Sequence, residues 1–179
     1  MGRLLVILSL VLSANLGFSP TTASADAPSR DTVRAMLSSF EQGPSQIQWR
    51  ALGAETVEVL IGLYNDPNEP GFVRMRAVAA TANFPTTATR AFLLEVASAP
   101  GQGDLYIRQA VSSLGRAFGD RALEDVRPFL VHSEYVVREA AVRALGAMRA
   151  PVARELLQAR MSVENEDAVR SALVEVLAR

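Results

Sequence analysis

Hydrophobic residues follow a helical spacing along most of the chain. In residues 54–65, Val57, Leu60, Ile61 and Tyr64 stand at positions i, i+3, i+4 and i+7. This spacing places their side chains on one face of an α-helix. No segment shows the alternation of apolar and polar residues that indicates a half-buried strand. The chain is therefore predicted to be all-α.

A second kind of helix is built around an arginine that recurs along the chain. These arginines are Arg76, Arg108, Arg138 and Arg170, which are 32, 30 and 32 residues apart. Each has apolar residues one position before it and three and six positions after it, which would lie on one helix face. In an additional N-terminal copy, Ser45 takes the arginine position, at a plausible helix start.

Another helical segment precedes each of these arginine helices. The expected segments are 31–42, 54–65, 86–98, 120–132 and 151–161. Proline and glycine residues separate the units, and Pro128 is expected to kink or divide the segment in which it lies. Gly53, Gly115 and Gly146 are predicted to end helices in a left-handed conformation.

The resulting units are pairs of helices about 31 residues long, and stacked pairs share a core that one pair cannot form alone. The stretch VREAAVRALG (137–146) and its repeated V-R-x-A resemble HEAT repeats, specifically the short subclass named after phycobilisome lyases. The resemblance covers roughly residues 45–179 and is weaker before them. It implies a right-handed α-solenoid of about five HEAT-like helical hairpins, an ARM-type superhelix. Residues 26–53 would form an N-terminal capping or degenerate repeat, and residues 54–179 four HEAT-like repeats.

The first 25 residues have the features of a secretory signal peptide. Arg3 precedes an apolar run at 4–12, and Ala23-Ser24-Ala25 is a small-x-small cleavage signal. The apolar run is too short to span a bilayer comfortably. The expected product is an exported protein, periplasmic or extracellular, that starts near Asp26 and keeps no stable membrane span.

Composition narrows the classes of function. The mature chain would lose Arg3 and keep 17 basic and 19 acidic residues, a net charge of −2 that argues against nucleic-acid binding. The absence of cysteine excludes disulfides, thiol catalysis and thiolate metal sites.

His132 is the only histidine and is expected to be exposed or to cap a helix. DPNEPG (66–71) is interpreted as a turn, because it lacks the glutamate of a calcium loop. No metal, cofactor or catalytic residue is predicted.

The recurring arginines are predicted to be structural. An acid stands four residues before three of them, an orientation that favours a helical ion pair. The pairs are Asp104–Arg108, Glu134–Arg138 and Glu166–Arg170. Arg76 has Phe72 at that position, and either Asp66 or Glu69 could serve it instead. The HEAT resemblance implies that such arginines form a ladder that ties successive units together.

Residues one and five positions after each ladder arginine are predicted to point away from the core. They are Ala77, Thr81, Gln109, Ser113, Glu139, Arg143, Ser171 and Glu175. This row is mixed and mildly polar, which suits a protein or peptide surface more than a lipid. The six from Gln109 to Glu175 are the candidate partner-binding residues.

The sequence therefore favours an exported scaffold that binds a protein or peptide through its concave face and catalyses no reaction. Two alternatives remain open. The protein could be a small-molecule-binding or lyase-like enzyme of the HEAT-like family. A pocket with convergent polar groups would favour this alternative. It could also be a structural subunit of the envelope. An exposed apolar repeat at the end of the solenoid would favour this alternative.

Overall fold

The computed structural model describes residues 27–39 and 43–179. The predicted signal peptide lies outside these residues. Within them every regular element is a helix, and no strand occurs. The α-helices are α1 (Arg30–Ser38), α2 (Gln46–Arg50), α3 (Thr56–Asn65), α4 (Gly71–Thr81), α5 (Thr87–Ser98), α6 (Asp104–Phe118), α7 (Leu123–Val126), α8 (Tyr135–Gly146), α9 (Pro151–Met161) and α10 (Asp167–Leu177). Two short 3₁₀ helices, η1 (Gly119–Ala122) and η2 (Arg127–Val131), flank α7.

Local sequence explains several helix boundaries. Ser29 and Thr86 accept hydrogen bonds from backbone N–H groups in the first turns of α1 and α5. Ser45 and Gln48 form a reciprocal capping box at the start of α2. Pro128 lies at the start of η2, and the segment that contains it is divided into three short pieces, as its sequence predicts.

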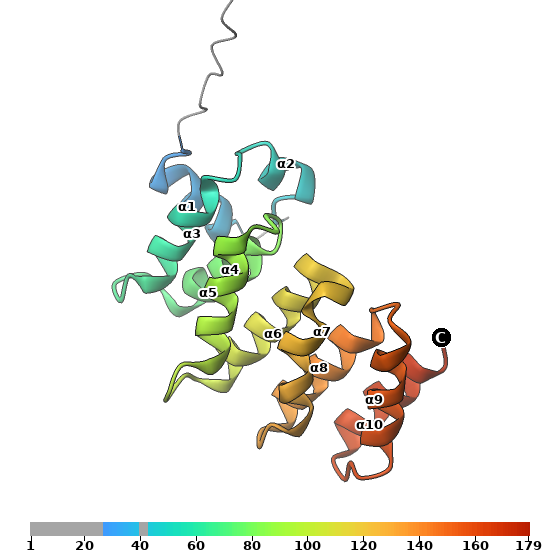
Figure 1. Cartoon of the computed structure of the whole chain (residues 1–179). Coiled ribbons are helices and arrows are strands. Elements are labelled where there is room, and N and C mark those ends of the chain that lie inside the picture. The colour runs from blue at the N-terminus through green and yellow to red at the C-terminus, as the bar shows by residue number, and fades with distance from the viewer. Residues whose placement is uncertain (1–26, 40–42) are drawn as a thin grey trace, which may run out of the picture.

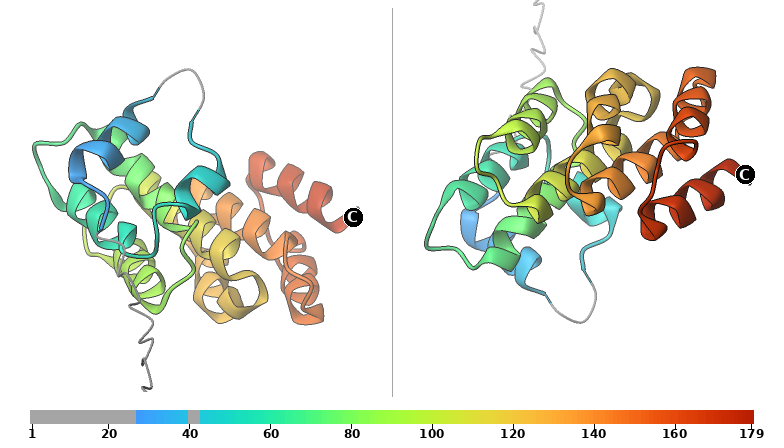
Figure 2. Two further views of the ribbon diagram at one scale, coloured as in Figure 1. Left: turned by 90° about the horizontal axis from the view of Figure 1, so that it is seen from above. Right: turned by 90° about the horizontal axis from the view of Figure 1, so that it is seen from below.

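The helices form an α-solenoid (Figure 1). Each unit has a first helix and a second helix, and the second helices α4, α6, α8 and α10 pack successively on one another. We call the solvent-facing side of this series the second-helix face. In the first described unit, α1 packs on both α3 and α4, whereas the short α2 lies apart from the main row of helices (Figures 1 and 2). Trp49 is the buried residue through which α2 joins the core.

The core has two parts. An N-terminal cluster extends from Val33 to Phe84, and a larger C-terminal cluster extends from Val78 to Val176. The two parts meet at α4, where Val78 belongs to the larger cluster and Ala77 to the smaller one. Ile61 and Tyr64 on α3 pack against both. Among the described residues, no helix is both long and apolar enough to cross a membrane.

The predicted glycine caps are correct in one case of three. Gly53 follows α2 with φ = +84°, a conformation that glycine adopts without strain. Gly115 lies inside α6 and Gly146 is the last residue of α8, and neither has a positive φ. The glycine with a positive φ after α6 is Gly119, with φ = +53° and ψ = −132°.

Gly115 and Gly146 allow neighbouring second helices to approach each other closely. A Cβ atom added to Gly115 would lie 2.6 Å from the Cβ of Ala144 on α8. A Cβ atom added to Gly146 would lie 2.5 Å from the Cβ of Val176 on α10. Both distances are too short for real carbon atoms, so at these positions glycine is required by helix packing and not by backbone conformation.

Candidate functional site

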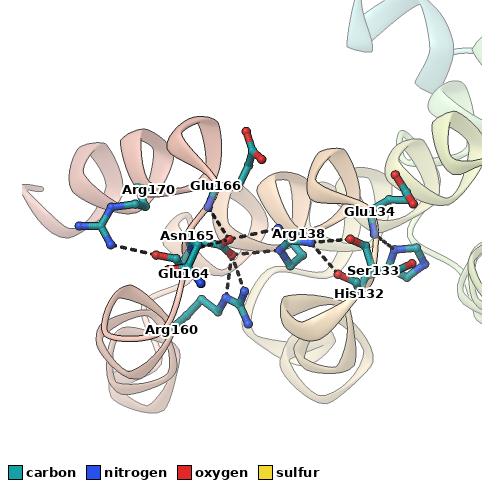
Figure 3. Close-up of polar contacts among 9 residues, drawn as sticks. All are labelled: His132, Ser133, Glu134, Arg138, Arg160, Glu164, Asn165, Glu166 and Arg170. Carbon is teal, nitrogen blue, oxygen red and sulfur yellow. Dashed lines mark hydrogen bonds and ion pairs between the residues drawn. The ribbon is translucent and has the colours of Figure 1, made fainter.

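Arg138 on α8 joins two successive units of the solenoid (Figure 3). Its Nε and Nη2 donate to the two carboxylate oxygens of Glu164, at 3.0 and 3.1 Å. Its Nη1 donates to the backbone carbonyl oxygens of His132 and Ser133, at 2.9 and 2.7 Å. Glu164 lies in the loop between α9 and α10, and Arg160 of α9 donates to it as well, at 2.6 Å. This bidentate geometry is the strong form of an arginine–carboxylate contact.

Glu164 is almost completely buried, with 2 % of its side chain exposed. The backbone N–H groups of Asn165 and Glu166 donate to its Oε1. Burial alone would raise the pKa of this carboxyl group. The hydrogen bonds from Arg138, Glu166 N–H and Arg160 outweigh burial and hold the pKa of Glu164 at about 2. We call Arg138, Arg160 and Glu164 the loop clasp.

The predicted ion pairs within single helices do not form. Glu134 and Glu166 are the N-cap residues of α8 and α10, and neither side chain caps its helix. Within the described residues, neither these two acids nor Asp104 forms an ion pair with the arginine four positions later. An exposed pair of this kind contributes only about 0.5 kcal/mol, whereas the buried carboxylate of Glu164 offers Arg138 a stronger partner.

The other ladder arginines differ from one another. Arg170 donates to the backbone oxygen of Glu164, at 2.9 Å. Arg108 is exposed, and no hydrogen bond or ion pair joins its side chain to another residue in the described part of the chain. The contact between units that the resemblance implied is therefore present at Arg138 and absent, within that part, at Arg108.

Arg76 is held by the end of α1. Its Nη1 donates to the carbonyl oxygens of Leu37 and Ser39, at 2.7 and 2.9 Å. Asp66 and Glu69, which the sequence suggested as partners of Arg76, bind arginines of α1 instead. Arg30 donates to Asp66 and Glu69, at 2.6 and 3.0 Å, and Arg34 donates to Glu69 as well. Sequence spacing missed Arg30 and Arg34, because 35 or more residues separate them from their partners.

The predicted outward row is partly correct. Arg143, Ser171 and Glu175 are exposed and Glu139 is half-buried. Ala77, Thr81 and Ser113 are instead buried, which corrects the prediction for them. Thr81 and Ser113 direct their hydroxyl groups to the carbonyl oxygen of Val78, and Ala77 belongs to the N-terminal core cluster.

Gln109 takes an intermediate position in this row. It is half-buried, and its side-chain amide donates to the hydroxyl oxygen of Ser113, at 3.2 Å. The solvent-facing part of the predicted row is therefore concentrated on α8 and α10.

A row of charges crosses the second-helix face there. Arg143 donates to Glu139 at 3.0 Å and to Glu175 of α10 at 2.9 Å. Arg179 donates to the other oxygen of Glu175 at 2.6 Å. Arg143 was predicted to point away from the core, and from that exposed position it joins α8 to α10. We call Glu139, Arg143, Glu175 and Arg179 the charged row.

The charged row remains accessible to solvent. Half of the Arg143 side chain and 48 % of the Glu175 side chain are exposed. The hydrogen bonds to Glu175 and Glu139 raise the pKa of Arg143, and the guanidinium of Arg143 lowers the pKa of Glu175. Exposed pairs of this kind contribute little to stability, so these charges are able to exchange partners with another molecule.

The remaining candidate residues have local structural roles. The backbone N–H of Glu134 donates to Nδ1 of His132, at 3.1 Å. The backbone N–H of Asn68 donates to the Asp66 carboxylate, at 2.9 Å, so the DPNEPG stretch forms a turn in which the aspartate accepts from the chain two residues on. No group of three or more metal-ligating side chains comes together among the described residues.

The stacked helix pairs, the inter-unit arginine and the close glycine contacts lie mainly in the C-terminal part of the chain. Residues 104–178 match the family model for HEAT repeats. This match and the all-helical architecture support a HEAT-repeat protein with an α-solenoid fold. The fold is of a kind often used as a scaffold for protein interaction. No curated protein matches the sequence.

Proposed function

We propose that this protein is an exported scaffold that binds a protein or peptide through the second-helix face and catalyses no reaction. The face formed by α8 and α10 is the proposed contact surface. The proposal includes the short HEAT subclass that the VREAAVRALG pattern resembles, and a periplasmic or extracellular location.

The charged row is the observation that supports the proposal most directly. It presents two cations and two anions on α8, on α10 and just beyond the end of α10, and all four side chains are at least partly exposed. Ser171, one turn before Glu175 on α10, is also exposed. Alternating charges of this kind favour a polar partner of complementary pattern and give specificity more than affinity.

Export is supported by the sequence of the first 25 residues. An exported scaffold without cysteine has to keep its shape through helix packing and polar contacts such as the loop clasp. A rigid face of this kind lowers the ordering cost of binding.

The test is recovery of a partner from the native envelope by the mature protein, residues 26–179. We expect the unchanged protein to recover a specific protein or peptide, and Ser171→Arg to lose it. The Ser171 side chain forms no hydrogen bond with another described residue, so this substitution adds bulk and charge to the face without removing a side-chain contact.

Gln158→Arg is the matched control. Gln158 is exposed on α9, a first helix, and the substitution should leave recovery unchanged. Equal recovery by Ser171→Arg would place the interaction elsewhere. Recovery of a small molecule and no protein would contradict the scaffold proposal.

A further inference from the structure

A hollow of about 570 Å³ lies between the first helices of two neighbouring units. Its lining comes from α7, from η2, from the second half of α9 and from Val163 in the loop that follows α9. The whole of this lining falls within residues 124–163, a continuous stretch that the structure describes. We call this space the first-helix hollow.

The hollow lies where Pro128 interrupts a first helix. Proline does not continue an α-helix, and this segment consists of the four-residue α7 followed by the 3₁₀ helix η2. On the other side, α9 packs mainly on α8 and α10. The interrupted segment and α9 therefore face each other across the hollow without close packing.

The walls of the first-helix hollow are mainly apolar. Leu130 is buried and Leu156 is half-buried, whereas Val131 and Val163 are 75 % and 63 % exposed. A single exposed valine is ordinary on a protein surface. Two exposed valines that line one hollow form a continuous apolar surface with the leucines, and a ligand that covers this surface removes it from water.

The charged residues of the lining already have partners. Arg127 donates through Nη1 to the Glu124 carboxylate, at 3.4 Å. Arg160 belongs to the loop clasp and donates to Glu164, at 2.6 Å. No other charged residue lines the hollow in the described part of the chain. A charged ligand would lose its water and find no unpaired opposite charge in the lining, whereas an uncharged ligand pays no such cost.

The volume of the hollow is that of a small-molecule site. Such sites measure about 300–1,000 Å³ and are lined predominantly by apolar side chains. The first-helix hollow has this size and this lining. Its paired charges restrict the ligand further, to molecules without a charge of their own.

We propose that the first-helix hollow binds an uncharged small molecule made mainly of hydrocarbon, which packs on Leu156 of α9 and on the two exposed valines, Val131 and Val163. This inference goes beyond the scaffold function, because the hollow is formed by first helices and shares no residue with the charged row. Loss of ligand binding here would leave the proposed partner surface on α8 and α10 unaffected.

Two fluorescent probes that differ in one group test the class of ligand. N-phenyl-1-naphthylamine is uncharged at neutral pH, and 1-anilinonaphthalene-8-sulfonate carries the same rings with a sulfonate. Each probe is titrated into the protein, and the rise in its emission is followed. We expect the uncharged probe to saturate, and the sulfonate to bind at least about tenfold more weakly because its charge loses water without gaining a partner.

A pair of variants on α9 tests the location. Ala159 lines the hollow, whereas its neighbour Gln158 does not, and both are exposed. Ala159→Glu places a charge in the lining and should weaken binding of N-phenyl-1-naphthylamine by about tenfold or more. Gln158→Glu adds the same charge outside the hollow and should leave binding unchanged. Probe that binds elsewhere on the chain contributes equally to both variants.

A second pair removes apolar surface and adds no charge. Val163 lines the hollow, and Val174 of α10 is similarly exposed, at 60 %, but lies outside it. Val163→Ser should weaken binding of the uncharged probe by about threefold or more, and Val174→Ser should not change it. Thermal unfolding shows that each variant is folded.

Three results would overturn the proposal. The first is the absence of a saturable rise in emission with N-phenyl-1-naphthylamine. The second is binding of the sulfonate that is as tight as binding of the uncharged probe. The third is undiminished binding of the uncharged probe by folded Ala159→Glu or Val163→Ser. The comparison of the two probes on the unchanged protein does not depend on how any variant folds.

Discussion

Glu164 holds a negative charge in a place that water hardly reaches. Its pKa of about 2 lies below the ordinary value of 4.5 because the hydrogen bonds from Arg138, from the backbone N–H of Glu166 and from Arg160 stabilise the charged form and outweigh burial. Between these two values the unfolded chain binds the proton more readily than the folded chain does. The stability that Glu164 contributes, about 3 kcal/mol at most, is therefore complete above about pH 5 and is lost as the pH falls towards 2.

Urea unfolding across this pH range checks the prediction by comparison with Glu164→Gln. The unchanged protein should exceed the variant in free energy of unfolding at neutral pH, and this difference should shrink steadily below about pH 5. Glu155→Gln, at an exposed position of α9, should show no such difference. A gap between the unchanged protein and Glu164→Gln that does not depend on pH would contradict the stated protonation.

Arg138 and Arg108 occupy equivalent positions in the repeat but have unequal surroundings. Arg138→Ala removes four hydrogen bonds and leaves the Glu164 carboxylate without its partner from α8. We expect a loss of about 3 kcal/mol in the free energy of unfolding. Arg108→Ala removes no such contact in the described chain and should change it by less than about 0.5 kcal/mol. Chemical denaturation measures both free energies of unfolding. Similar losses for the two variants would mean that the loop clasp does not cause the destabilisation of Arg138→Ala.

Among the helices, close packing at glycine decides how far apart the second helices lie. Gly115→Ala would improve the intrinsic helix propensity of α6 by up to about 1 kcal/mol. The new methyl group would nevertheless meet the Cβ of Ala144 at 2.6 Å, and overpacking of this kind costs about 1–3 kcal/mol. We therefore expect a lower melting temperature for Gly115→Ala.

Gly62→Ala is the control for this prediction. A Cβ at Gly62 would meet only the Nη1 of Arg30, at 3.8 Å, so the gain in helix propensity should raise the melting temperature. Adding Ala144→Gly to Gly115→Ala removes the contacting methyl group and should recover part of the loss. No recovery in the double variant would show that the contact between α6 and α8 is not responsible.

Periodicity predicted the helices well because burial of one face is a local property of the sequence. The segment 54–65 becomes α3 (Thr56–Asn65), and 151–161 becomes α9. Contacts between units could not be predicted in this way. Arg138 and Glu164 are 26 residues apart, and only the folded chain shows that the buried carboxylate is a better partner than Glu134. The same applies to Gly115, whose neighbour Ala144 belongs to the next unit.

In the whole molecule, the two core clusters suggest a division in stability. Solenoid units contact mainly their neighbours, so their stability is distributed and not fully cooperative. The smaller N-terminal cluster, around Leu60, includes the short α2, whereas the larger cluster, around Leu173, extends over most of the remaining units. We expect the amides of α1 and α3 to exchange hydrogen at a lower opening free energy than those of α6 and α8.

Two leucine substitutions test this division. Leu60 and Leu173 are both fully buried, and truncation of either to alanine should cost about 2–5 kcal/mol locally. Leu60→Ala should reduce hydrogen-exchange protection mainly in α1, α3 and α4, and Leu173→Ala mainly in α8, α9 and α10. Because α4 contributes Val78 to the larger cluster, its protection should fall less than that of α3 in Leu60→Ala. A uniform loss of protection along the chain in both variants would mean that the solenoid opens as one cooperative unit.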